Sequence, residues 1–149
     1  MRGMVDTIYV PVAIAIAIIM ITIVASIYIS ISNELGTVIP FFADSATAAK
    51  MNNAFLYIIF AVYLGIPIVS VILALLSSSH PALIPLSIIF LLFSGLISII
   101  MKIVIVSILP EFSYYTFLSD NQLFLLLIEY MPFIMIVFAS FIIIAQYVI

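Results

Sequence analysis

The sequence predicts an all-α integral membrane protein, a four-helix transmembrane bundle built from two hairpins. Of the 149 residues, 68% are hydrophobic and 6% are charged, whereas soluble domains carry roughly 25% charged residues. Several apolar runs reach the roughly 20 residues that a helix needs to cross hydrocarbon, and they lack the alternation of a membrane β-barrel. We therefore expect one membrane domain over 1–149, with helices at about 9–32, 45–76, 82–109 and 120–148.

The charged residues and the lack of cysteine exclude several functional classes. Asp and Glu number 6 and Lys and Arg number 3, for a net charge of −3. A surface that binds nucleic acid or anionic lipid head groups needs clustered basic residues, which this chain lacks. Without cysteine there is no disulfide, thiolate metal site or cysteine nucleophile. We expect no nucleic-acid partner and no cofactor.

The first helix, 9–32, follows a short basic start that resembles a signal peptide. Its apolar run continues to Ile31, which is longer than a typical signal h-region, so we expect a retained membrane helix. Ala13 and Ala17 lie one turn apart, the small-xxx-small spacing that lets another helix approach closely. The alternative is that these alanines only fill an Ile/Ala-rich run.

A polar link, 33–53, leads to the second helix. Phe41 and Phe42 follow a proline in this link, and aromatic residues at such a corner are typical of the membrane interface. We expect them to act as interfacial anchors. Asp44 precedes a run of helix-forming residues and is the predicted N-cap of the second helix.

The interior of the second helix carries a packing motif and a predicted bend. Ala61 and Gly65 form another small-xxx-small pair, which predicts a helix–helix contact. Pro67 removes a backbone donor and clashes with the preceding turn. We therefore expect a kink at Gly65-Ile66-Pro67.

A serine- and proline-rich turn, 77–81, separates the second helix from the third. In the third helix Ser94, Gly95 and Ser98 form a small polar face, with Ser94 and Ser98 as expected packing positions. Serine in such a helix often donates to the carbonyl four residues earlier, so this polarity does not by itself indicate a pathway.

The aromatic link 110–122 precedes the last helix. Tyr114 and Tyr115 in this link are expected interfacial anchors, since tyrosine combines an apolar ring with a polar tip. A ligand-binding aromatic site is the alternative. Ser119 and Gln122 have capping-box spacing, which places the start of the last helix near 120. Pro132 predicts a kink inside that helix.

Lys102 and Glu129 are the only charged residues inside the apolar runs. At about 1.5 Å of rise per residue, both lie roughly 10 Å below the rim next to the aromatic link. A charge in hydrocarbon is costly, so matched depth predicts that the two residues form a pair. A structural clamp that fixes helix register is the favoured interpretation, since the inner halves of both helices offer no further titratable group for a relay. A proton or ion relay is the alternative.

The remaining residues do not form a catalytic set. The single histidine, His80, lies in a turn before a proline and has no carboxylate beside it in the sequence. The acidic residues show no metal-ligand spacing. We expect no enzymatic activity.

The function that we expect is structural. The chain is predicted to be a small integral membrane protein of a larger membrane-embedded assembly, with a membrane protein of a lipid-containing virion as the best candidate. Its expected partners are membrane lipids and other membrane or capsid proteins, and a homo-oligomer stays open. The alternatives are an accessory subunit of a membrane enzyme complex, and a small ion or proton channel or transporter that uses Lys102 and Glu129.

Overall fold

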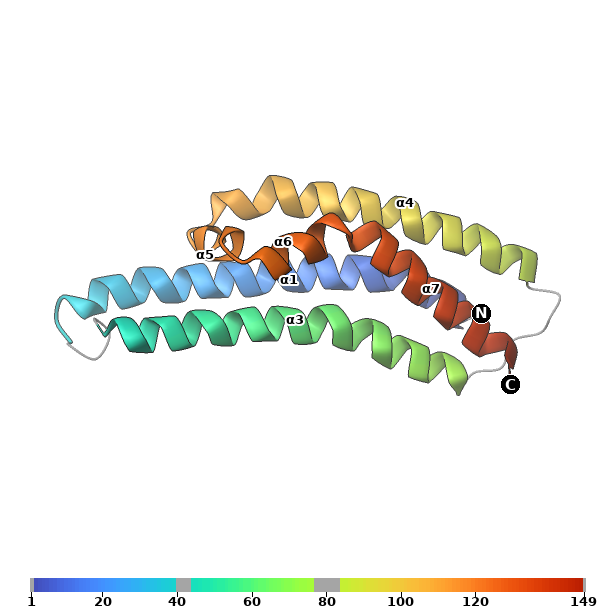
Figure 1. The fold of residues 1–149 in the computed structure, drawn as a ribbon, viewed down its shortest axis with the longest axis horizontal. Coiled ribbons are helices and arrows are strands. Elements are labelled where there is room, and N and C mark those ends of the chain that lie inside the picture. The colour runs from blue at the N-terminus through green and yellow to red at the C-terminus, as the bar shows by residue number, and fades with distance from the viewer. Residues whose placement is uncertain (1, 40–43, 77–83, 149) are drawn as a thin grey trace.

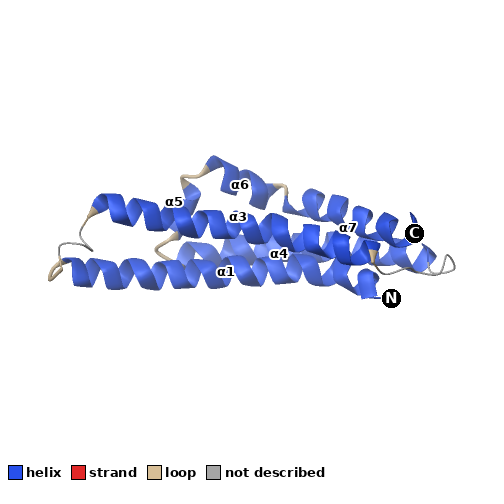
Figure 2. Ribbon diagram, turned by 90° about the horizontal axis from the view of Figure 1, so that it is seen from below, coloured by secondary structure: helices blue, strands red, loops and turns tan. Residues whose placement is uncertain are grey.

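The computed structural model of the chain describes residues 2–39, 44–76 and 84–148. Within these ranges every regular element is a helix and no strand occurs (Figure 2). The elements in chain order are α1 (Arg2–Gly36), α3 (Ser45–Leu75), α4 (Ile84–Ile108), the short 3-10 helix η2 (Leu109–Glu111), α5 (Tyr115–Ser119), α6 (Gln122–Glu129) and α7 (Met131–Val148). Phe41 and Phe42, the expected anchors, lie outside the described residues, as do 82 and 83, where the third helix was expected to begin.

Three segments are long and apolar enough to cross a membrane, namely Thr7–Gly36, Ser45–Leu75 and Ile84–Glu111. A fourth span results if α6 and α7 are counted together, and these two helices are bent by 64° relative to each other. The chain is therefore an all-helical protein with three to four helices compatible with a multi-pass membrane protein. Its first helix extends beyond the predicted 9–32 at both ends.

The long helices α1, α3 and α4 run side by side along the long axis of the molecule, with α1 packed against both others (Figure 1). Helix α7 packs against all three and closes the bundle. The two ends of the chain lie at the same end of the bundle (Figure 1). The opposite end carries the end of α1 and the start of α3.

Each long helix buries one apolar stripe and leaves the rest of its surface exposed. The buried stripes meet along the bundle axis through residues such as Ile14 and Ile18 of α1, Ile59 of α3 and Ile105 of α4. Large apolar side chains such as Leu92 of α4 remain exposed on the outside. An apolar exterior over the full length of the helices is the surface that a bilayer solvates.

Three helical hydroxyl groups, those of Thr22, Ser98 and Ser140, donate to backbone carbonyls four residues earlier in the same helix. Thr22 Oγ1 donates to Ile18 O at 2.8 Å, and Ser98 Oγ donates to Ser94 O at 2.7 Å. This pattern was expected for Ser98, and it satisfies the hydroxyl without a partner on another helix.

The predicted N-cap of α3 is confirmed. Asp44 accepts hydrogen bonds from Ala46 N at 3.2 Å and from Thr47 Oγ1 at 2.9 Å. The Thr47 hydroxyl and then the Ala46 N–H stabilise the charged carboxylate and lower the pKa of Asp44. Because the folded pKa is the lower one, this contribution to stability is present above the unfolded pKa and is lost as the pH falls through the folded value.

The predicted capping box at Ser119 is wrong. Helix α6 is capped by Asn121, whose side chain accepts from Phe124 N at 3.0 Å. Ser119 instead ends the additional helix α5 and donates its hydroxyl to Thr116 O at 2.9 Å. The spacing suggested the wrong residue because the link contains one more helical turn than the sequence indicated.

Helix α3 continues through Gly65 and Pro67 as a single element. Pro67 is buried, and a bend at this position stays a prediction.

Candidate functional site

The most distinctive feature of the bundle is the break between α6 and α7. The backbone ladder of α6 ends with Tyr130 N–H donating to Leu126 O at 2.9 Å. The ladder of α7 begins with Ile134 N–H donating to Tyr130 O at 3.0 Å. Pro132 has no backbone N–H to offer. The carbonyls of residues 127, 128 and 129 therefore lack their regular helical donors.

Each of these three carbonyls accepts a hydrogen bond from another donor. Tyr63 of α3 donates its hydroxyl to Leu127 O at 2.8 Å, and Lys102 Nζ of α4 donates to Glu129 O at 3.0 Å. The carbonyl of Ile128 accepts from Tyr130 N–H at the end of α6. Unpaired backbone groups in hydrocarbon cost several kcal/mol each, so side chains from two neighbouring helices make the break compatible with a membrane interior.

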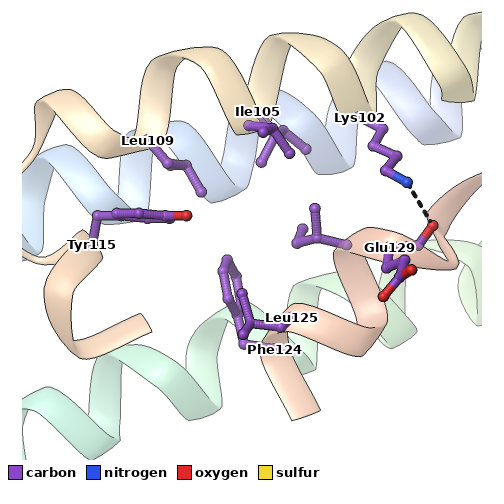
Figure 3. Close-up of a pocket in the computed structure, with 9 residues that line it drawn as sticks. Lys102, Ile105, Leu109, Tyr115, Phe124, Leu125 and Glu129 are labelled. Carbon is purple, nitrogen blue, oxygen red and sulfur yellow. Dashed lines mark hydrogen bonds between the residues drawn. The ribbon is translucent and has the colours of Figure 1, made fainter. Parts of the chain in front are cut away.

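Lys102 and Glu129 lie together, but they are joined through a different group than the sequence suggested. The amine of Lys102 binds the Glu129 backbone carbonyl, while the carboxylate of Glu129 points away from it (Figure 3). That carboxylate makes no hydrogen bond or ion pair with any residue that the structure describes. The end of α6 carries partial negative charge on its last carbonyls, which favours a cation at this position.

A hollow of about 400 Å³ adjoins this contact, between α4, α5 and α6 (Figure 3). Its walls are apolar, and Tyr115 of α5 points its ring into it (Figure 3). Val106 and Leu125 form exposed parts of the lining on α4 and α6. Lys102 and Glu129 lie at one end, so the hollow is apolar except at that charged end. Its full lining comprises Lys102, Ile105, Val106, Leu109, Tyr115, Phe124, Leu125, Ile128 and Glu129.

Tyr114, expected at the membrane interface, is 0% exposed and lies inside the protein. Its hydroxyl donates to Asn52 O of α3 at 2.5 Å, and its backbone N–H donates to Ser26 Oγ of α1 at 3.1 Å. Its ring stacks on Phe117 at 5.5 Å between centroids and meets Phe55 edge-on at 6.0 Å. Tyr114 is buried because its polar tip has a partner in the protein. It connects the aromatic link to α1 and α3.

The small polar face of α4 is buried against the neighbouring helices. Ser94, Gly95 and Ser98 are all buried. A Cβ atom added to Gly95 would lie 3.1 Å from Cδ1 of Ile136, so α4 and α7 approach closely here.

The other expected packing positions are less enclosed. Ala13 and Ala17 are half-buried, and Ala61 is exposed. Gly65 is half-buried, and a Cβ added to it would meet no atom within 4 Å. The roles of these four residues in packing stay predictions.

Sequence reasoning missed Tyr63 and Gln146. Tyr63 is buried, and its hydroxyl caps the Leu127 carbonyl. In the sequence, the only indication of this role is a tyrosine in the middle of an apolar helix. Gln146 of α7 is buried, and neither polar atom of its amide has a hydrogen-bond partner among the described residues. Among residues 7–39, 44–76 and 84–147, no Asp, Glu, Lys, Arg or His is buried.

The described part of the chain contains no group of three or more His, Cys, Asp or Glu residues that could hold a metal ion. No protein-family model matches the chain, and no curated protein or solved structure matches it significantly.

Proposed function

We propose that this chain is a structural integral membrane protein of a larger membrane-embedded assembly. One observation carries the proposal, namely that the Lys102 amine is used to cap the Glu129 carbonyl and so to hold the broken helix. A relay needs titratable groups in series across the bundle. The buried tyrosines Tyr63 and Tyr114 donate their hydroxyls to backbone carbonyls. The other buried polar residues in the described ranges are serine, threonine and glutamine, and Thr22 and Ser98 donate into their own helices.

In this proposal α6 and α7 together form the fourth span, so the chain makes two hairpins with both termini on one side of the membrane. The bends that Pro132 and the Gly65–Pro67 segment predict would serve helix packing and not gating. The common location of both chain ends in the bundle supports this topology (Figure 1).

Single-cysteine labelling tests the topology. Because the sequence has no native cysteine, each variant carries a single reactive thiol. We expect Gly3→Cys and Tyr147→Cys to react with a membrane-impermeant maleimide from the same side of sealed vesicles. Thr116→Cys, in the aromatic link, is the control and should react from the opposite side. Labelling of residues 3 and 147 from opposite sides would exclude four spans.

The functional proposal predicts that the purified protein has no transport activity. In liposomes it should conduct neither protons nor small ions above the lipid background, because the described interior offers no chain of titratable groups. Fluorescent pH and potential dyes measure this directly, with Glu129→Gln as the matched variant. Reproducible flux that depends on Glu129 would replace the structural proposal with the transporter alternative.

Isolation from native membranes identifies the assembly. We propose a lipid-containing virion, which predicts that the chain copurifies with membrane particles of defined size and with capsid proteins. Copurification with a stoichiometric enzyme would assign it instead as an accessory subunit. An isolated chain with no partner protein would contradict both.

A further inference from the structure

The Glu129 face of the bundle places a carboxylate on an otherwise apolar exterior. This face consists of Leu125, Leu126, Glu129, Tyr130 and Phe133. The first four follow helical spacing at the end of α6, and Phe133 of α7 lies beside Tyr130 with ring centroids 6.5 Å apart. All five residues are exposed, with Phe133 at 68% and Leu126 at 50%. The Glu129 carboxylate has no partner among the described residues, because the nearby Lys102 amine binds the carbonyl instead.

We propose that the Glu129 face is a homodimer interface, in which Glu129 of one copy meets Lys102 of the second copy. The inference rests on the proposed membrane-embedded function, since a carboxylate that faced lipid would be costly there. A second copy removes that cost by covering the carboxylate with a cation and with apolar side chains.

Symmetry favours a second copy as the occupant. A twofold axis along the membrane normal leaves the depth of every atom unchanged. The 3.0 Å contact from Lys102 Nζ to Glu129 O shows that the two residues share one depth within a chain, so they also share it across such a dimer. A twofold interface is self-complementary, because each residue pair occurs twice. Two Lys102–Glu129 contacts would then cancel all four charges.

The charge inventory supports the same occupant. Of the three basic residues, Arg2 begins α1 and Lys50 lies in the second turn of α3, so neither is at the depth of Glu129. Lys102 is only half-buried, and an ammonium group has three donors, of which Glu129 O takes one. The hollow beside it, edged by Val106 and Leu125, gives room for an apolar side chain of the second copy.

Cross-linking of single-cysteine variants in proteoliposomes at low protein density tests the interface. We expect Leu126→Cys to form covalent dimers with a short bismaleimide. Leu64→Cys is the control, because Leu64 is 44% exposed on α3 and follows Tyr63, which contacts Leu127. Leu64→Cys should remain monomeric.

The contribution of the charge is tested in the Leu126→Cys background. Glu129→Gln should raise the dimer dissociation constant roughly tenfold, as expected for the loss of the two symmetry-related charge contacts between membrane helices. The fold of the monomer should persist, since the backbone carbonyl that Lys102 binds remains. Glu111→Gln is the matched control, because Glu111 is exposed in η2 and away from this face, and it should leave the constant unchanged.

Three outcomes would overturn the dimer. They are equal cross-linking of Leu64→Cys, monomers at every protein density, as expected if lipid covers the face, and cross-linking of Leu126→Cys in native membranes only to a different protein. The proposed function fails by a separate result. Flux that depends on Glu129 would end the structural assignment even where Leu126→Cys still forms dimers.

Discussion

Replacing Tyr114 with alanine should lower the free energy of unfolding by about 3–5 kcal/mol, the usual cost of removing a large aromatic ring from a core. Tyr114 is 0% exposed, and its ring contacts Phe55 and Phe117. The substitution would leave a cavity and also remove the donor to Asn52 O. The aromatic link would then lose its main attachment to α3.

Unfolding by SDS in mixed micelles measures this effect, with two variants as comparisons. Tyr115→Ala removes the same side chain from a half-buried neighbour and should cost clearly less. Tyr114→Phe keeps the ring and removes only the hydroxyl, for an expected loss of about 0.5–1.5 kcal/mol, the net value of one hydrogen bond, since the Asn52 carbonyl lies within the continuous helix α3 and keeps its helical donor. Equal losses for Tyr114→Ala and Tyr115→Ala would show that Tyr114 is not a core residue.

Replacing Lys102 with methionine should lower the free energy of unfolding of the monomer by about 1.5–3 kcal/mol, the range for a hydrogen bond from a charged group. The methionine keeps the apolar stem but leaves the Glu129 carbonyl without its donor at the break. Glu129→Gln should change monomer stability very little, because the Glu129 side chain has no partner among the described residues.

The asymmetry between these two variants separates a backbone cap from a side-chain ion pair. An ion pair predicts that both single changes are costly and that the double change restores stability. A cap predicts that Lys102→Met costs the same with or without Glu129→Gln. SDS unfolding at protein concentrations where the monomer predominates measures all three variants. Tyr63→Phe, which removes the other side-chain cap, should cost about 1–3 kcal/mol because the Leu127 carbonyl has no helical donor at the break and would be left unpaired.

The long apolar helices could be predicted from sequence because a membrane leaves the backbone few options. A chain in hydrocarbon must satisfy its own N–H and C=O groups, which favours continuous helices wherever apolar runs are long enough. The second helix was expected at 45–76 and is found at Ser45–Leu75. The extra helix α5 was not expected, because a link of mixed polar and aromatic residues carries no clear helical period.

The atoms in contact at the site could not be predicted in the same way. Depth along a helix follows from residue count, so the proximity of Lys102 and Glu129 was expected from sequence. Direction depends on rotation about the helix axis and on the break, which turns the Glu129 carbonyl toward α4 and its carboxylate away (Figure 3). Tyr114 and Tyr115 are chemically identical, and only the path of the short helix α5 determines which of them is buried.

The two side chains that close the break, Tyr63 and Lys102, are synthesised before the carbonyls that they cap. Without these two side chains the Leu127 and Glu129 carbonyls would be unpaired in lipid, so we expect α6 and α7 to gain their bent form only against α3 and α4. We therefore expect an order of assembly in which α3 and α4 are in place before the C-terminal segment docks against them, so that the bend forms last.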